Sequence, residues 1–302
     1  MPAAKIGNLR RTMAAFLEES GVARPLFEAD ALFCHVLGTS RALLHTHPER
    51  IVSEAALSDI LTLALRRATG EPLAYLLGDA LFCGRTFAVD RRTLIPRPET
   101  EILAARADAH IRRKPDAVFA DWCTGSGCIA ITLLADHPAA RAFAVDASAG
   151  ALAVAARNAA THGVSDRLTL IACADPRDAA AQIPRDSLDL VVCNPPYIAT
   201  EELPGLEPQV RNFEPRMALD GGDDGLDLCR LLLARLPYFA KPDAPLLFET
   251  GGPEQIDRLA EWAKKTAPSV EYAETFSDQR GIRRFAVWRK SPEATKIDPD
   301  KK

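Results

Sequence analysis

The stretch Asn194-Pro195-Pro196-Tyr197 combines residue types that could hold a planar nitrogen group. It follows residues 188–193, an apolar run that predicts a buried strand. Two prolines remove backbone donors and fix the chain, so the Asn194 amide and the Pro195 carbonyl are held in place. These two acceptors could bind both N–H groups of an amide or amine and turn its delocalised lone pair toward an electrophile, while Tyr197 stacks on it. A Pro-Pro turn that only closes a strand is the alternative.

A glycine-rich turn, Cys123-Thr124-Gly125-Ser126-Gly127, follows another predicted strand. With Ala130 it matches the Gly-x-Gly-x-x-Gly/Ala fingerprint, and Asp146 lies 21 positions after Gly125. Glycines let the backbone approach a ligand closely, and a carboxylate at the next strand end can accept from both ribose hydroxyls. The pattern predicts an adenosine cofactor, but nicotinamide dinucleotides and S-adenosylmethionine both carry that ribose. A glycine turn that only packs helix on strand is the structural alternative.

Asp175 ends a third predicted strand, with Pro176 next to it. A carboxylate there could accept from an adenine amino group, and an Asp that merely caps a turn fits equally well. The amide clamp favours methyl transfer over hydride transfer, since a dehydrogenase has no use for it. No side chain presents itself as a general base, and Asn194 cannot take up the proton. We therefore expect catalysis by positioning.

The order strand, glycine turn, helix, strand from residue 117 onward predicts a Rossmann-like, doubly wound α/β sheet. Its carboxyl edge would collect the polar residues just described. The last two strands are expected to be antiparallel, which gives seven strands with an antiparallel last strand. The expected strands are 117–122, 141–145, 168–173, 188–193, 245–249, 270–276 and 282–288, and the expected helices are 128–136, 149–161, 226–236 and 254–265.

Residues 1–80 predict a small all-α domain that serves for substrate docking or as a lid. Residues 25–37 are predicted to form a helix that begins at Pro25 and ends before Gly38. Ser53 is a plausible N-cap for another helix that ends near Gly70. Residues 81–96 predict a β-hairpin linker of two strands joined near Asp90-Arg91.

Residues 96–101 lead into the next predicted helix. The need to start that helix would by itself explain their prolines and acidic residues. A loop of about 25 residues, including 199–222, follows Tyr197, and loops of that length are usually functional or mobile. The charged tail 291–302 is expected to be disordered.

Composition narrows the function. The 302 residues are 47% hydrophobic with a net charge of −4, which gives no general attraction to nucleic acid or to an anionic membrane. No apolar run approaches the roughly 18 residues of a membrane span. The seven cysteines form no CxxC pair, which indicates a reducing cytoplasm without disulfides or a zinc site, and we expect no bound metal.

The chain resembles the class I S-adenosylmethionine-dependent methyltransferases of the HemK/PrmC type, which methylate the glutamine of the Gly-Gly-Gln loop in peptide chain release factors. The similarity runs from Gly70 to Arg284. The segments that carry it are Gly70–Gly78, Ile95–Glu101, Thr124–Ala130, Val145-Asp146, Asn194–Ile198, Phe213–Pro215 with Ala218-Leu219, and Gly221–Leu226.

The resemblance implies that Cys123 to Gly127, Asp146 and Asn194 contact S-adenosylmethionine, and that Asn194 to Tyr197 hold the substrate glutamine. S-adenosylhomocysteine would be the product, residues 97–290 the methyltransferase domain, and residues 1–80 the seat of the release factor. Two positions depart from the family pattern. Cys123 stands where glycine is common, so its backbone is expected in a region that non-glycine residues tolerate, and Pro176 stands where some relatives have an aromatic residue.

Three alternatives stay open beside this one. A sister enzyme methylates a glutamine of a ribosomal protein, but the Arg97–Glu101 segment favours the release-factor branch. An adenine-specific DNA methyltransferase shares Asn-Pro-Pro-Tyr but would need a basic DNA-binding face, which the acidic balance argues against. The third alternative is a cofactor-binding protein without catalysis.

Overall fold

The computed structural model describes residues 5–291, and these form two compact units. One unit contains the chain up to Asp79 together with Glu207–Phe213, and the other contains Ala80–Leu206 and the chain from Glu214 onward. The predicted tail 291–302 lies outside the described residues except for Ser291. No helix within residues 5–291 is long and apolar enough to cross a membrane.

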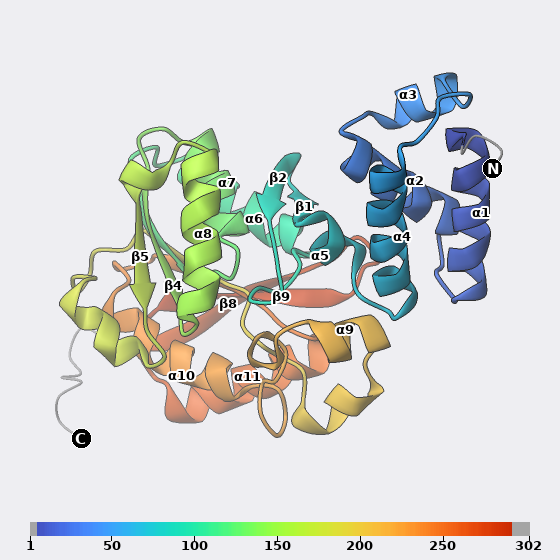
Figure 1. The fold of residues 1–302 in the computed structure, drawn as a ribbon. Helices are drawn as coiled ribbons and strands as arrows, with labels where there is room; N and C mark the ends of the chain where they lie inside the picture. Colours follow the sequence, from blue (N-terminus) through green and yellow to red (C-terminus); the bar gives the residue numbers. More distant parts are fainter. Residues whose placement is uncertain (1–4, 292–302) are drawn as a thin grey trace. The chain divides into compact units, whose positions relative to one another are not determined.

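The first unit is helical (Figure 1). The Ser53 hydroxyl accepts a hydrogen bond from Ala56 N–H at 3.2 Å and so caps the longest helix. Gly38, at φ 58°, ends the second helix in the left-handed region, as expected for a C-terminal glycine. The helices are α1 (Ile6–Glu19), α2 (Pro25–Leu37), α3 (Arg41–Thr46), α4 (Glu54–Ala68), α5 (Leu73–Leu77) and α9 (Pro208–Phe213).

The second unit begins with a hairpin of β1 (Asp79–Phe82) and β2 (Arg85–Ala88). The predicted turn near Asp90-Arg91 was wrong, because the chain reverses at Cys83 and Gly84, both at positive φ (48° and 73°). A two-residue turn of this kind usually carries Asn-Gly or Asp-Gly. Cys83 stands at the position of the Asn or Asp, so the sequence lacks the usual turn signal. Residues 93–95 form no strand.

A seven-stranded sheet forms the centre of the second unit (Figure 1). The strand order is β5-β4-β3-β6-β7-β9-β8; β9 runs antiparallel to both of its neighbours and the other neighbouring pairs are parallel. This confirms the predicted fold class. The strands are β3 (Val118–Trp122), β4 (Arg141–Asp146), β5 (Leu168–Ala172), β6 (Leu190–Cys193), β7 (Pro245–Glu249), β8 (Val270–Ser277) and β9 (Arg283–Lys290).

Helices cover both faces of the sheet, as alternation along the strands requires. On β6, Leu190 and Val192 pack with the helices of one face, whereas Val191 and Cys193 pack with those of the other. The first face is covered by α6 (Thr100–Ile111), α7 (Cys128–Asp136) and α8 (Ala149–Thr161), and the second by α10 (Asp227–Arg235) and α11 (Pro253–Thr266) (Figure 1).

The segment after Tyr197 is not the long loop that the sequence predicted. It contains the 3₁₀ turns η3 (Thr200–Gly205) and η4 (Arg216–Ala218) and, between them, α9. Each turn is too short to show an amphipathic period, which explains why pattern reasoning missed them. Three further 3₁₀ turns are η1 (Ser165–Arg167), η2 (Pro176–Ala181) and η5 (Leu236–Tyr238).

Candidate active site

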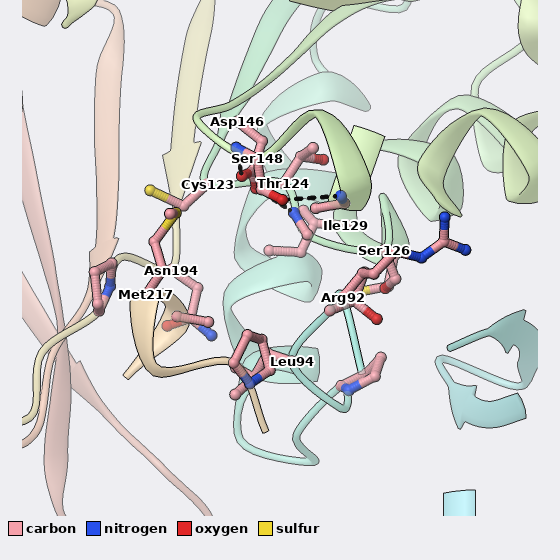
Figure 2. Close-up of a pocket in the computed structure, with 18 of the residues that line it drawn as sticks. Arg92, Leu94, Cys123, Thr124, Ser126, Ile129, Asp146, Ser148, Asn194 and Met217 are labelled. Carbon is pink, nitrogen blue, oxygen red and sulfur yellow. Dashed lines mark hydrogen bonds between the residues drawn. The ribbon is translucent and has the colours of Figure 1, made fainter. Parts of the chain in front are cut away.

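A cavity of about 250 Å³ opens at the carboxyl ends of β3, β4 and β6, where an open α/β sheet binds its ligands (Figure 2). Its walls come from the segment before α6, the glycine turn after β3, the end of β4, the Asn-Pro-Pro-Tyr turn and the segment around η4. The lining residues are Arg92, Thr93, Leu94, Pro96, Arg97, Thr100, Cys123, Thr124, Gly125, Ser126, Cys128, Ile129, Asp146, Ala147, Ser148, Ala151, Asn194, Pro196, Pro215, Met217, Ala218 and Leu228.

The two glycines of the turn after β3 have different surroundings. A Cβ at Gly127 (φ 79°) would lie 2.7 Å from Ile131 Cδ1 and 3.2 Å from Ala155 Cβ, so this glycine lets α7 pack against α8. A Cβ at Gly125 (φ 56°) would meet no atom within 4 Å, and Gly125 lines the cavity. Gly125 therefore leaves room for a ligand, whereas Gly127 leaves room for a helix.

Asp146 closes one side of the cavity (Figure 2). Gly125 N–H donates to its Oδ2 at 2.9 Å, and Ser148 N–H donates to its Oδ1 at 2.9 Å. Burial raises the pKa of this carboxyl, and the two backbone hydrogen bonds oppose the rise. Each carboxylate oxygen keeps a further lone pair, so Asp146 can still accept from a diol.

Cys123 differs from expectation. Its φ is 62°, in the left-handed region that favours glycine, where a Cβ costs about 1–2 kcal/mol. The sequence predicts a backbone region that non-glycine residues tolerate, whereas few of them adopt this one. Cys123 therefore adopts a backbone conformation in the glycine-rich turn that glycine would adopt without this cost.

Asn194 lines the cavity and is tied to α6. Its Nδ2 donates to Thr100 Oγ1 at 3.0 Å, and the Thr100 hydroxyl donates to Glu249 Oε2 at 2.9 Å. Tyr197 OH donates to the other oxygen of Glu249, Oε1, at 3.3 Å. Burial of Glu249 at the end of β7 raises its pKa to about 7. Burial also raises the pKa of Tyr197 well above the ordinary value of a tyrosine.

The Gly221–Gly225 segment packs closely against the Asn-Pro-Pro-Tyr turn. A Cβ at Gly221 would lie 2.7 Å from the Pro196 carbonyl oxygen, and a Cβ at Gly225 would lie 2.2 Å from the Tyr197 carbonyl oxygen. Gln255 Nε2 also donates a hydrogen bond to the Tyr197 carbonyl oxygen, at 2.7 Å. The glycine segment therefore supports the turn by close backbone contact.

A buried ion pair joins two other segments that carry the resemblance. Arg97 Nη2 donates to Glu214 Oε1 at 2.6 Å, and Ile95 N–H donates to the other oxygen, Oε2, at 3.1 Å. The side chain of Glu214 is only 1% exposed. The pair holds the chain next to Pro96 and Pro215, which both line the cavity.

Some predicted site residues do not line the cavity. Asp175 instead accepts from Arg177 N–H at 2.9 Å at the start of η2, and its ion pair with the Arg177 side chain lowers its pKa to about 2. Pro176 is buried at the start of the same turn. Gly127, Pro195 and Tyr197 lie next to lining residues without lining the cavity themselves.

Sequence reasoning missed three residues of the site: Thr100, Glu249 and Asp121. Asp121 Oδ2 accepts from the Thr124 hydroxyl at 2.7 Å and from Ala130 N–H at 3.2 Å, so it shapes the glycine turn. Its Oδ1 is buried and has no hydrogen-bond partner among the residues that the structure describes. A carboxylate at the end of an apolar strand, as in Asp121 and Glu249, was the signal that could have found two of them. Across the described part of the chain, no group of three or more His, Cys, Asp and Glu is placed to hold a metal ion.

Comparison with known proteins defines the class. The family model "Methyltransferase small domain" matches residues 99–205, and the model "PrmC N-terminal domain" matches residues 8–78. With the sheet order described above, these matches make the chain a Rossmann-like methyltransferase.

Curated relatives then identify the family. A protein of Nitratidesulfovibrio vulgaris named "Release factor glutamine methyltransferase" is 41% identical over 289 residues, 95% of this chain and 96% of its own. One of the same name from Cereibacter sphaeroides is 42% identical and covers 78% of this chain and 81% of its own. The chain belongs to the release factor glutamine methyltransferase family, which confirms the resemblance seen in the sequence.

Among solved structures, the hMettl16 catalytic domain in complex with the MAT2A 3'UTR hairpin 6 superposes with a TM-score of 0.51. It covers 80% of this chain and 84% of its own at 16% identity. Similarity at this level shows the shared fold alone.

Proposed function

We propose that this enzyme transfers the methyl group of S-adenosylmethionine to the side-chain amide nitrogen of the glutamine in the Gly-Gly-Gln loop of peptide chain release factors. S-adenosylhomocysteine is the product. The observation that carries the proposal is the anchored Asn194 amide, which faces the same cavity as the Asp146 carboxylate. Family membership supports the choice of glutamine, and the names of the relatives support the choice of release factor.

The lining residues fit the cofactor. Asp146 accepts only one backbone N–H on each oxygen, which leaves capacity for the two ribose hydroxyls, and the space over Gly125 is open. Cys123, Thr124, Ser126 and Gly127 shape the turn beside it. When bound, S-adenosylmethionine supplies an electrophilic methyl group on a sulfonium centre.

The residues of this chain bind and orient the substrate amide. Asn194 Oδ1 and the Pro195 carbonyl accept its two N–H groups, which turns the lone pair out of conjugation and toward the methyl group. Pro196 and Tyr197 keep the turn rigid, and Tyr197 packs against the planar amide. Asn194 cannot take up a proton, so the proton lost after transfer goes to water.

The alternatives differ in the acceptor, so acceptors are the test. The purified enzyme is incubated with radiolabelled S-adenosylmethionine and a release factor, a ribosomal-protein extract or duplex DNA. We expect label in the release factor, and none in a release factor whose Gly-Gly-Gln glutamine is replaced by alanine. Label confined to the ribosomal extract or to DNA would contradict the proposal.

We also propose that the helical unit, predicted as residues 1–80, seats the release factor in the cytoplasm. On α4, Ile60 and Ala64 are buried, but Leu61 and Leu65 are 45% and 59% exposed one turn apart. An exposed apolar pair of this kind suits contact with a protein partner. Neither a membrane nor nucleic acid is part of the proposal.

Surface substitutions test this role better than deletion does, because residues 207–213 also belong to the helical unit and would lose their packing partners. We expect Leu61→Lys with Leu65→Lys to raise KM for the release factor by roughly 10-fold, the loss of about 1.4 kcal/mol of contact, at unchanged affinity for S-adenosylhomocysteine. Leu81→Lys, an exposed leucine of the other unit, is the control. An unchanged KM in the double variant would remove the docking role.

A further inference from the structure

Behind Asn194 lies a short chain of hydrogen bonds that ends at a buried carboxylate. The chain runs from Asn194 Nδ2 to Thr100 Oγ1 at 3.0 Å and from the Thr100 hydroxyl to Glu249 Oε2 at 2.9 Å. Tyr197 OH donates to Glu249 Oε1 at 3.3 Å. Thr100 and Glu249 are only 3% and 1% exposed, so bulk water does not compete for these contacts.

The direction of each hydrogen bond follows from the donors available. An ionised carboxylate only accepts, so the hydroxyl hydrogens of Thr100 and Tyr197 both point at Glu249. Thr100 has a single hydroxyl hydrogen and therefore offers Asn194 only a lone pair. A lone pair must be met by an N–H group, so the nitrogen of the Asn194 amide faces Thr100 and the oxygen faces away from it.

We propose that Thr100 and Glu249 are positioning residues that fix the orientation of the Asn194 side-chain amide, so that its oxygen faces the substrate. The inference rests on the proposed function for its kinetic consequence. The two ends of an asparagine amide are almost equal in size, so packing alone distinguishes them poorly. A reversed amide would set an N–H group against the N–H groups of the substrate glutamine.

The protonation state of Glu249 decides whether this orientation holds. Its pKa is raised to about 7, chiefly by burial, while the hydrogen bonds from Thr100 and Tyr197 oppose the rise. Among the charged groups that act on it, Glu99 raises the pKa and Arg284 lowers it. A protonated Glu249 can donate to Thr100, which can then donate to Asn194 Oδ1. The productive orientation is therefore fixed above about pH 7, and the reversed orientation becomes available as the pH falls through that value.

Nuclear magnetic resonance on the full-length enzyme labelled with ¹⁵N-asparagine tests the inference without any substrate. The Asn194 side-chain signal is assigned by its absence in Asn194→Ala. We expect this signal to shift with a midpoint near pH 7 in the wild type and to lose the shift in Glu249→Gln, whose side chain has nearly the same shape. The same titration in Glu249→Gln would overturn the inference.

Kinetics with the release factor provide the second measurement. We expect Thr100→Val to lower kcat by roughly 10- to 100-fold, the effect of one buried hydrogen bond, and Thr100→Ser to stay within about 3-fold of the wild type. Affinity for S-adenosylhomocysteine should change little in either variant, whereas Thr100→Val should also lower the temperature of unfolding, because it leaves a buried Glu249 oxygen without its donor. Thr161→Val, which removes a hydroxyl bonded to the Arg157 carbonyl on the surface of α8, is the matched control.

The outcomes separate the two levels of the proposal. A wild type that labels no release factor contradicts the proposed function, and the Asn194 titration then still decides the orientation. A wild type that labels the release factor while Thr100→Val retains its full kcat overturns the positioning role. Failure of Thr100→Ser to restore kcat would overturn it too, because Thr100 would then act through its methyl group.

Discussion

Arg97 and Glu214 form an ion pair at 2.6 Å across 117 positions of the chain, and this pair connects two segments of the cavity wall. The Glu214 side chain is 1% exposed and also accepts from Ile95 N–H. Because both of its oxygens are used by the chain itself, Glu214 is a structural residue of the site. It holds the segment before α6 beside the segment that contains η4.

Glu214→Ala should therefore lower the free energy of unfolding by about 2–4 kcal/mol, since it leaves a partly buried guanidinium and a backbone N–H without their acceptor. Denaturant titration measures the change, and affinity for S-adenosylhomocysteine should fall with it. Glu261→Ala, which removes the carboxylate of an exposed pair with Lys264, should leave stability almost unchanged. Equal effects of the two substitutions would contradict this view of Glu214.

Asn194→Ala should abolish methyl transfer and leave cofactor affinity within a few-fold, because Asn194 is proposed to act on the substrate amide. Transfer is measured with labelled S-adenosylmethionine and a release factor, and affinity by calorimetry with S-adenosylhomocysteine. We expect a loss in kcat of roughly 100-fold or more, as for removal of a group that orients the reacting atoms. A parallel loss of binding and transfer would mean that Asn194 mainly holds the cofactor.

Gly125→Ala and Gly127→Ala form a matched pair that should separate cofactor binding from stability. A Cβ at Gly127 (φ 79°) would meet Ile131 and Ala155, so we expect that variant to lose about 1–3 kcal/mol of stability to overpacking, in addition to left-handed strain. A Cβ at Gly125 meets no protein atom, so the cost to stability is limited to about 1–2 kcal/mol of left-handed strain. Cofactor affinity should nonetheless fall more in Gly125→Ala, because its methyl group occupies the open space above the turn. Calorimetry with S-adenosylhomocysteine and denaturant titration measure the two losses in each variant. A greater loss of cofactor affinity in Gly127→Ala than in Gly125→Ala would contradict the prediction.

Asp121 predicts a pH dependence of stability. Full burial raises its pKa from 3.8 to about 7, so its contribution to stability is complete below pH 3.8 and is lost as the pH rises through about 7. Between pH 6 and pH 8 this single group should lower the free energy of unfolding by about 1.4 kcal/mol. Asp121→Asn should flatten that slope, whereas Asp257→Asn, at an exposed pair with Arg283, should leave it as in the wild type. Parallel slopes in Asp121→Asn and the wild type would exclude Asp121 as the titrating group.

The sequence was sufficient for the sheet and for much of the cavity. Short apolar runs, prolines at helix starts and glycines at helix ends are local signals, so helices such as Pro25–Leu37 and Cys128–Asp136 were predicted with their observed bounds. Gly125, Asp146 and Asn194 were found because each follows a strand, and parallel strands bring their carboxyl ends together.

What could not be predicted depends on contacts between distant segments. The pairing of Thr100 with Glu249 joins residues 149 positions apart, and no local pattern indicates which hydroxyl meets which carboxylate. The hairpin turn was misplaced because Cys83 adopts a positive φ that usually belongs to asparagine or glycine. The sequence left Asp175 open between an adenine contact and a turn cap, and its side chain accepts from Arg177, two positions further along the chain.

The close approach of Gly221 and Gly225 to the carbonyl oxygens of Pro196 and Tyr197 has an evolutionary consequence. A side chain at either glycine would displace the backbone of the turn that we propose holds the substrate, so substitution at either position should require a compensating change elsewhere. We therefore expect substitutions in the two segments, which are separate in the sequence, to be coupled. Relatives that change acceptor while keeping the amide clamp should vary their surfaces and retain both glycines.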